Sequence, residues 1–255
     1  KKFKLPLLLL FVFLFSEAFS YDNIKKDKKT IINSIESQKD RLIEISDNIW
    51  EAAEPALLEF KSSKYLSDYA EENGFRVTRG VAEIPTAFVA EFGSGKPVIG
   101  ILGEFDANPG ISQKKQPTKE PLVKGAAGHG CGHNLYGTGS LGAAIAIKEM
   151  IESGEISGTI RFYGTPAEET IFAKVWMVRA GLFDDVDVCM DWHPSDEVEA
   201  ATQSSKALVD FRLRFFGDAS HASGDPWNGN SAVDAMELYT TGLNYYREHV
   251  RPTAR

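Results

Sequence analysis

Val98-Ile99-Gly100-Ile101-Leu102 is an uninterrupted apolar run inside a strand that we predict from Pro97 to Phe105. A strand without polar alternation is typical of one that is buried on both faces, as in the sheet of an α/β protein. Strand and helix patterns alternate around it. The predicted strands are 87–92, 97–105, 159–163 and 186–192, and the predicted helices are 57–72, 135–151 and 173–180. This order predicts an α/β fold with a doubly wound, mostly parallel sheet.

Two glycine-rich segments resemble nucleotide-binding motifs only weakly. Gly93-Ser94-Gly95-Lys96 lies between the first two predicted strands, and we interpret it as a hairpin turn because Pro97 stands where a phosphate-binding helix would begin. Residues 137–142 match G-x-G-x-x-G, but a Cys/His segment precedes them and 160–163 supply no acidic residue. We interpret these small residues as the packing face of a helix.

The pattern changes near residue 204. Val209, Phe211, Leu213 and Phe215 alternate with polar residues, which predicts a half-exposed strand of an antiparallel sheet. A helix is predicted from about residue 231 to 249. We therefore predict a catalytic domain at 21–203 and the start of a smaller α+β domain at 204–255. About 50 residues are too few for a separate core, so we expect the sequence to be part of a longer protein.

The N-terminus has the pattern of a targeting segment. Basic residues precede the apolar run Leu5–Phe15, and the small residues Ala18 and Ser20 follow it. This predicts a secretory signal over residues 1–20 and a secreted or periplasmic protein. The run is too short for a permanent membrane span. Residues 22–49 then have the spacing of an amphipathic helix.

Composition excludes several classes of protein. The 255 residues carry a formal net charge of −8, with 43% hydrophobic and 25% charged residues, which are ordinary globular values. The acidic balance argues against a nucleic-acid partner. Two cysteines are too few for a dense disulfide scaffold.

Metal-ligating residue types follow the predicted strands. Cys131 and His133 flank Gly132, the pair Glu168-Glu169 follows the strand at 159–163, and His193 follows the strand at 186–192. Sites in open α/β sheets gather at the carboxyl ends of strands, so these side chains can converge. Thiolate and imidazole are good ligands for zinc and related ions. The pattern therefore predicts a metal site.

Each of these residues also has an ordinary structural explanation. Cys131 could form a disulfide with Cys189 in an oxidising compartment, although the apolar neighbours of Cys189 predict a place in the core. A single histidine is more often structural than a ligand, and a Glu pair usually lies in a solvated loop. The three clusters together favour a metal site over these alternatives.

Residues 98–232 resemble the amidohydrolase branch of the dinuclear-metal exopeptidase superfamily, and within it the aminobenzoyl-glutamate utilisation protein B group. The matching stretches are Leu102-Gly103-Glu104-Phe105-Asp106-Ala107, residues 128–134, residues 161–169, Trp192-His193-Pro194 and residues 221–229. Their order and spacing are much more specific than any single motif.

The resemblance implies a role for each candidate residue. Two divalent ions, manganese or zinc, would be bound by Cys131, His133, Glu169 and His193. Glu168 would be the general base, and Asp106 would orient a ligand. His221 would reach the substrate of a partner subunit from the smaller lid domain, which in this family forms a homodimer.

The sequence departs from the family pattern at three places. Thr170 stands where a glycine is usual, and Asn108 stands where a leucine is usual. The last histidine ligand of the family has no counterpart before Arg255. We therefore expect this chain to supply only part of the complete site.

The resulting functional hypothesis is a secreted metal-dependent amidohydrolase acting on an N-acyl or N-aroyl amino acid. One alternative is a dipeptidase of the same superfamily, whose substrate has a free amino end. Another is an exported binding protein that keeps the fold without catalysis. A purely structural surface protein would leave the Cys/His/Glu clustering unexplained.

Overall fold

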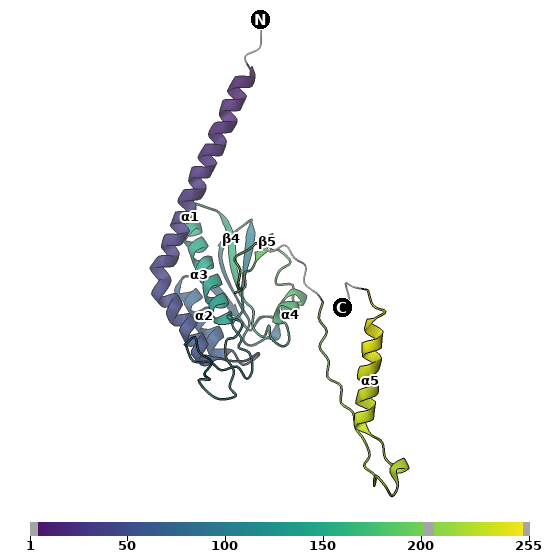
Figure 1. Cartoon of the computed structure of the whole chain (residues 1–255). Helices are drawn as coiled ribbons and strands as arrows, with labels where there is room; N and C mark the ends of the chain where they lie inside the picture. The colour runs from purple at the N-terminus through teal and green to yellow at the C-terminus, as the bar shows by residue number, and fades with distance from the viewer. Residues whose placement is uncertain (1–4, 201–206, 252–255) are drawn as a thin grey trace. The chain divides into compact units, whose positions relative to one another are not determined.

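The computed structural model describes residues 5–200 and 207–251 (Figure 1). The chain forms two units, Lys1–Asp196 and Glu197–Arg255. The domain boundary predicted at residue 203/204 lies outside the described residues, so it stays a prediction.

The first unit is built on a five-stranded sheet with the order β1-β2-β4-β3-β5. The strands are β1 (Arg76–Arg79), β2 (Phe88–Ser94), β3 (Val98–Gly103), β4 (Gly158–Gly164) and β5 (Val188–Met190). β3 runs parallel to both of its neighbours, β4 and β5, whereas β2 is antiparallel to β1 and to β4. The α/β class is confirmed, and the sheet is mixed with a parallel half of three strands.

The hairpin predicted at Gly93–Lys96 is wrong. β2 and β3 do not pair with each other, because β4 lies between them and pairs with both. β4 is buried at six of its seven residues, with only Arg161 partly exposed, so the most buried segment takes the central position. A turn signal between two strands says nothing about a third strand that enters between them from later in the chain.

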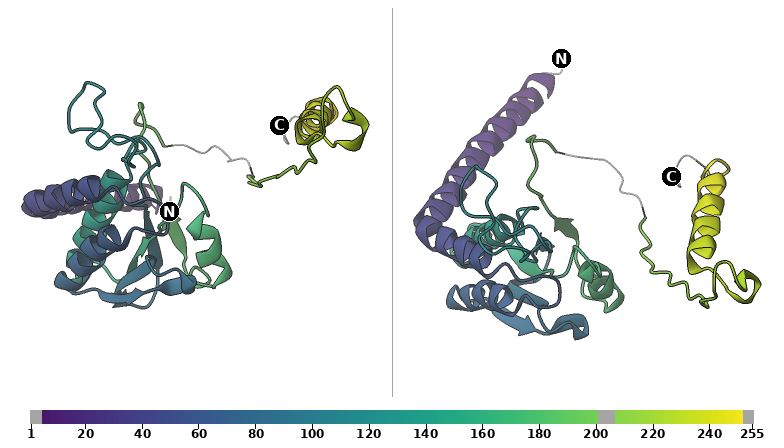
Figure 2. Two further views of the ribbon diagram at one scale, coloured as in Figure 1. Left: turned by 90° about the horizontal axis from the view of Figure 1, so that it is seen from below. Right: turned by 60° about the horizontal axis from the view of Figure 1, so that its bottom comes forward.

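Helices cover both faces of the sheet, as a doubly wound fold requires (Figures 1 and 2). They are α1 (Leu5–Ala52), α2 (Phe60–Glu72), α3 (His133–Glu152) and α4 (Ala173–Arg179). Alternate residues of β4 point into two cores. Ile160 and Phe162 belong to the core with α1, α2 and α3, while Tyr163 packs with Met177 of α4.

The predicted helix at 22–49 is part of the single long helix α1 (Figure 1). The predicted secretory signal falls on the first part of this helix and on residues 1–4, which lie outside the described residues. Secretion therefore stays a prediction. Within the described residues, none of the helices combines the length and apolar content that crossing a membrane requires.

α3 lies unusually close to the end of β3. A Cβ atom added at Gly137 would stand 2.6 Å from the carbonyl oxygen of Glu104 and 3.1 Å from Leu66. Only glycine fits this contact without displacing backbone. The small residues at 137–142 therefore serve helix packing, as predicted, and they bring the start of α3 against the strand end that carries Glu104.

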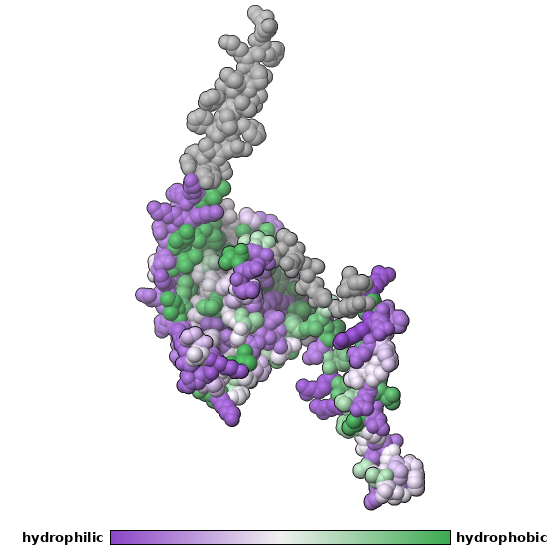
Figure 3. Space-filling view, viewed as in Figure 1, coloured by the Kyte–Doolittle hydropathy of each residue, from purple (hydrophilic) through white to green (hydrophobic). Residues whose placement is uncertain are grey.

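The second unit contains a short 3₁₀ helix, η2 (Pro226–Asn228), and the helix α5 (Ala232–Arg247). The strand predicted over 209–215 is not formed: these residues have no strand structure, and Val209 is 80% exposed. A strand needs a hydrogen-bonded neighbour, and no described segment of this unit pairs with it. Apolar side chains therefore stay on the surface of this unit (Figure 3), and Leu208, Phe216 and Leu238 are among its exposed residues.

Candidate metal centre

The candidate residues gather at the carboxyl end of the parallel half of the sheet. Glu104 and Asp106 follow β3, Glu168 follows β4 and His193 follows β5. Parallel strands end at the same edge, so these three connections lie together. The first turn of α3 approaches the same edge and carries His133.

Gly132 joins two of the predicted ligands. Its φ of +79° is in the left-handed region, and a Cβ atom there would stand 2.9 Å from the side chain of Pro194. Glycine therefore lets the chain turn between Cys131 and His133 while the segment with His193 packs against it.

Cys131, His133 and His193 form the first cluster. One ligand atom from each lies within 4.8 Å of the other two. The Cys131 Sγ atom is 3.5 Å from His193 Nε2, and the two imidazole rings meet edge-on with centroids 5.6 Å apart. A thiol and two imidazoles at this spacing are a donor set suited to zinc and related ions.

Neither cysteine forms a disulfide, so the alternative pairing of Cys131 with Cys189 is absent from the structure. The prediction that Cys189 is a core residue is wrong, because it is exposed. β5 is the edge strand of the described sheet. A strand at an edge lacks the second neighbour that would help to bury its side chains.

Glu104, His133 and Glu168 form a second cluster, with one ligand atom from each within 4.8 Å of the others. Glu104 is only 4% exposed. Its Oε1 is paired with the ammonium group of Lys174, which comes from α4. Its Oε2 lies 2.9 Å from His133 Nε2 and 3.9 Å from His193 Nε2. His133 therefore belongs to both clusters.

The hydrogen bonds of His133 show what its second nitrogen faces. Nδ1 is 3.0 Å from the backbone carbonyl oxygen of Asp106 and 3.0 Å from its Oδ1. A carbonyl oxygen only accepts, so Nδ1 carries a proton and donates. In the neutral ring Nε2 then holds a lone pair. This lone pair faces Glu104 Oε2, and both atoms are buried without a hydrogen bond.

Two acceptors at this distance need a positive charge beside them. Burial alone would lower the pKa of His133, but the carboxylates of Asp106 and Glu104 outweigh burial and raise it to about 11. The site therefore favours a cation at Nε2, either a proton or a metal ion. The unpaired Nε2 and Oε2 atoms, beside a thiol and a second imidazole, fit a divalent ion.

Glu168 and Glu169 occupy different positions around this centre. Burial raises the pKa of Glu168, and the nearby charge of Glu104 raises it further, as suits a group that must accept a proton. The backbone N–H of Glu169 donates to Asp106 Oδ2 over 2.9 Å. The Glu169 carboxylate is in neither cluster, but it adds to the effect of burial in raising the pKa of Cys131.

His221 belongs to the second unit, so its approach to the metal centre stays a prediction. Its Nδ1 accepts hydrogen bonds from the backbone N–H groups of Ser223 and Gly224, at 3.3 and 2.9 Å. In the neutral ring these bonds place the proton on Nε2. The exposed His221 side chain thus presents an N–H donor, which is the form that its predicted role requires.

Sequence reasoning missed Glu104 and Lys174. Glu104 is the first polar residue after the apolar strand β3, so the strand-end argument that selected Glu168 could also have found it. Lys174 has no comparable local signal. It reaches Glu104 only because α4 packs beside the ends of β3 and β4.

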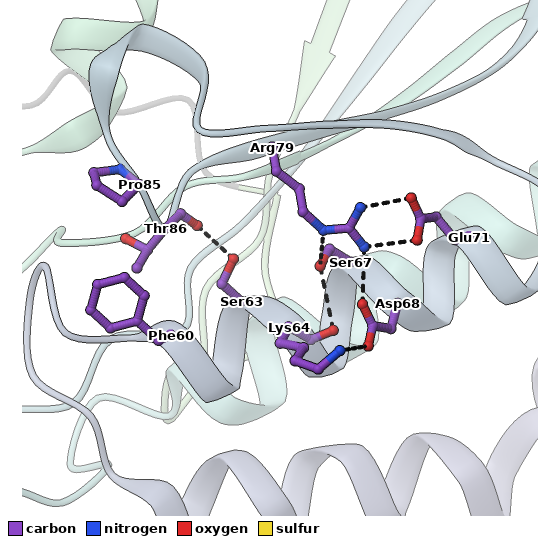
Figure 4. Close-up of a pocket in the computed structure, with 9 residues that line it drawn as sticks. All are labelled: Phe60, Ser63, Lys64, Ser67, Asp68, Glu71, Arg79, Pro85 and Thr86. Atoms are coloured by element: carbon purple, nitrogen blue, oxygen red, sulfur yellow. Dashed lines mark hydrogen bonds and ion pairs between the residues drawn. The ribbon is translucent and has the colours of Figure 1, made fainter.

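Two pockets in the first unit differ in their relation to this centre. One, of about 450 Å³, is lined by Trp50, His129, Cys131 and His193 among others, and so opens beside the first cluster. The other, of about 500 Å³, lies at α2 (Figure 4). There Arg79 is bound by Asp68 and Glu71, so its charge is already neutralised.

A thiol, two imidazoles and carboxylates at the carboxyl edge of an α/β sheet are the arrangement of a metal-dependent hydrolase. The model of the peptidase family M20/M25/M40 matches residues 100–250, which include every residue of the two clusters. The chain belongs to this family.

Individual relatives agree with this assignment. The chain is 46% identical to one of the p-aminobenzoyl-glutamate hydrolase subunits of Escherichia coli, over 88% of this chain and 47% of that protein. It is 32% identical to Xaa-Arg dipeptidase of Mus musculus, over 89% of this chain and 52% of that protein. The chain therefore spans about half the length of these curated relatives.

Among solved structures, the Bacillus subtilis YXEP protein, a dinuclear metal-binding peptidase of the M20 family, matches with a TM-score of 0.53. The identity is 27%, and the match covers 60% of this chain and 42% of that one. A putative aminohydrolase from methicillin-resistant Staphylococcus aureus shares the fold, with a TM-score of 0.62 and 24% identity over 88% of this chain and 58% of that one.

Proposed function

We propose that the protein is a metal-dependent amidohydrolase that cleaves the amide bond of an N-acyl or N-aroyl amino acid, of the aminobenzoyl-glutamate type. The observation that carries this proposal is the buried contact of His133 Nε2 with Glu104 Oε2, 2.9 Å apart, which requires a proton or a metal ion and lies beside Cys131, His193 and Glu168. The similarity to a subunit of p-aminobenzoyl-glutamate hydrolase supports an N-aroyl amino acid as the substrate class.

Cys131, His133, His193 and Glu169 are the residues that would hold two divalent ions, which we propose to be manganese or zinc. Bound ions of this kind polarise a carbonyl group and lower the pKa of water. The protein supplies the rest of the chemistry. Asp106 fixes His133 through Nδ1, and Lys174 partly neutralises the negative charge of Glu104.

Glu168 would act as the general base. It takes a proton from the attacking water and later delivers that proton to the leaving amine. Its raised pKa favours this exchange, because a carboxylate with an ordinary pKa returns a proton too readily near neutral pH. The Nε2–H of His221 would donate to the oxygen on which negative charge develops, from the lid domain of the partner in a homodimer.

We also propose that the protein is exported to the periplasm or secreted, on the basis of residues 1–20. Its partners would be a small amide substrate and a second copy of itself. The chain also matches the other named component of the Escherichia coli hydrolase, at 30% identity, so a second type of chain is an alternative partner.

A dipeptidase is the second candidate function, favoured by the similarity to an Xaa-Arg dipeptidase. The decisive experiment uses the natural full-length protein that contains this sequence. Its metal content is measured by elemental analysis, and it is incubated with aminobenzoyl-glutamate, N-acetyl amino acids and Xaa-Arg dipeptides. Release of amine from the acylated substrates supports the amidohydrolase, and release from the dipeptides alone supports the dipeptidase. Metal binding with ligand uptake but no amine release would indicate a binding protein.

A further inference from the structure

Glu59 is a buried carboxylate with no role in the chemistry described above. Its side chain is fully buried at the start of α2, and burial raises its pKa. It does not cap the helix: the N–H groups of Lys61 and Ser62 donate to the carboxylate of Glu54 instead. The carboxylate of Glu59 is therefore free to bind elsewhere.

Both oxygens of Glu59 accept hydrogen bonds from other segments. Oε1 accepts the backbone N–H of Ala167 over 2.9 Å, and Oε2 accepts the hydroxyl of Thr86 over 3.0 Å. The carbonyl of Thr86 in turn accepts the hydroxyl of Ser63, one turn further along α2 (Figure 4). This separate bond joins α2 to the segment of Thr86 and involves neither Glu59 nor Ala167.

Ala167 is the residue immediately before Glu168, and its backbone is strained. It is fully buried and has a φ of 55°, in the left-handed region that alanine rarely adopts. Such a conformation persists only where the surroundings determine it. Its carbonyl accepts the N–H groups of Ile171 and Phe172, while its own N–H is bound by Glu59.

Alternate N–H groups of the connection after β4 are bound by two segments, the end of β3 with the residues directly after it and the start of α2. Thr165 donates to the carbonyl of Gly103, Ala167 to Glu59, and Glu169 to Asp106. Glu168 lies between Ala167 and Glu169, the donors of the last two bonds. Its carboxylate belongs to the cluster with Glu104 and His133. Removing the bond to Glu59 would release the strained backbone of Ala167, the residue directly before Glu168.

We propose that Glu59 is a positioning residue: its Oε1 holds the N–H of Ala167 and thereby aims the Glu168 carboxylate at the reacting water. This inference rests on the proposed function for the role of Glu168. What is required of Glu59 is an acceptor of the right length, and its charge is not required.

The test compares Glu59→Met, which fills similar space without an acceptor, with Glu59→Gln, which keeps an acceptor, in the natural full-length protein. Ser63→Ala is the matched control, because it breaks a neighbouring buried hydrogen bond without touching Ala167. For Glu59→Met we expect kcat to fall about 100-fold, as for a displaced catalytic group, with KM and metal content nearly unchanged. Glu59→Gln and Ser63→Ala should keep kcat within roughly threefold.

A second readout does not depend on activity. Hydrogen–deuterium exchange over residues 165–172 should be faster in Glu59→Met, and unchanged in Glu59→Gln and Ser63→Ala. If the unsubstituted protein cleaves no amide, the proposed function fails, while exchange still tests whether Glu59 holds this segment. Unchanged exchange or unchanged kcat in Glu59→Met would overturn the inference. A hundredfold lower kcat in Glu59→Gln would also overturn the inference. This variant keeps the inference testable even if Glu59→Met does not fold.

Discussion

The two nitrogens of the His133 ring have different surroundings. Nδ1 donates to Asp106, which fixes the ring orientation, and Nε2 lies 2.9 Å from Glu104 Oε2. Because two carboxylates surround the ring, its pKa is raised to about 11, and the metal-free protein carries a proton on Nε2 at neutral pH. The thiol of Cys131 also has a raised pKa, so it too is protonated there.

Metal binding at pH 7.5 should therefore release protons. We expect about two per site, one from His133 and one from Cys131, because both groups must lose a proton to become ligands. Titration calorimetry in buffers of different ionisation enthalpy measures this number. In Cys131→Ser the release should fall to about one, with weaker binding. Proton release that is the same in both proteins would remove Cys131 from the metal site.

The substitution Glu168→Gln tests, at the scale of a single residue, whether Glu168 is the general base. We expect kcat to fall by roughly 10²–10⁴-fold, because glutamine cannot take a proton from water, while metal content stays normal. Steady-state kinetics and elemental analysis on one preparation measure both. A variant with normal metal content and near-normal turnover would show that another group acts as the base.

At the scale of elements, the contact between α3 and the end of β3 keeps His133 next to Glu104. Gly137 faces the backbone of Glu104 at a distance that no larger residue allows. Backbone cannot move aside as the end of a flexible side chain can, so a substitution there must shift the helix or the strand end.

Gly137→Ala should therefore destabilise the first unit by about 1–3 kcal/mol through overpacking, although alanine favours a helix more than glycine. Gly242→Ala is the control, since a Cβ atom at that position in α5 meets nothing within 4 Å. It should leave the unfolding of the first unit unchanged. Urea unfolding followed by circular dichroism measures both. Equal midpoints for Gly137→Ala and the unsubstituted protein would contradict the close contact.

At the scale of the whole molecule, the metal centre connects segments that are distant in the sequence. It joins the connections after β3, β4 and β5 to the start of α3. A ligand that binds only the folded protein stabilises it in proportion to the logarithm of its concentration over Kd. The centre should therefore contribute to the stability of the whole first unit.

Chelation should lower the unfolding temperature of the metal-loaded protein. At a metal concentration of 100 times Kd the lost stabilisation is about 2.7 kcal/mol, or roughly 5–10 °C for a unit of this size. Differential scanning calorimetry with and without EDTA measures the shift. His193→Ala, which lacks one donor of the first cluster, should show a smaller shift. An equal shift in both proteins would indicate that EDTA removes metal from another place.

The sequence by itself predicted the elements of the first unit and the side chains at their ends. The apolar run in β3, the helix spacing in α2 and the ligand types at Cys131, His133 and His193 are local patterns, because burial and periodicity act over a few residues. Because sites in open α/β sheets gather at the carboxyl ends of strands, the sequence also predicted that Cys131 and His193 meet. In the structure Cys131 Sγ lies 3.5 Å from His193 Nε2.

Only the tertiary structure decided what depends on contacts between distant segments. β4 enters between β2 and β3, Lys174 reaches Glu104, and Glu59 binds Ala167 across more than 100 residues of sequence. The predicted strand at 209–215 shows the converse: its alternation is clear, but without a hydrogen-bonded neighbour it forms no strand. Local patterns predict which side chains of a segment can be buried. The packing of the whole chain decides which other segment it pairs with.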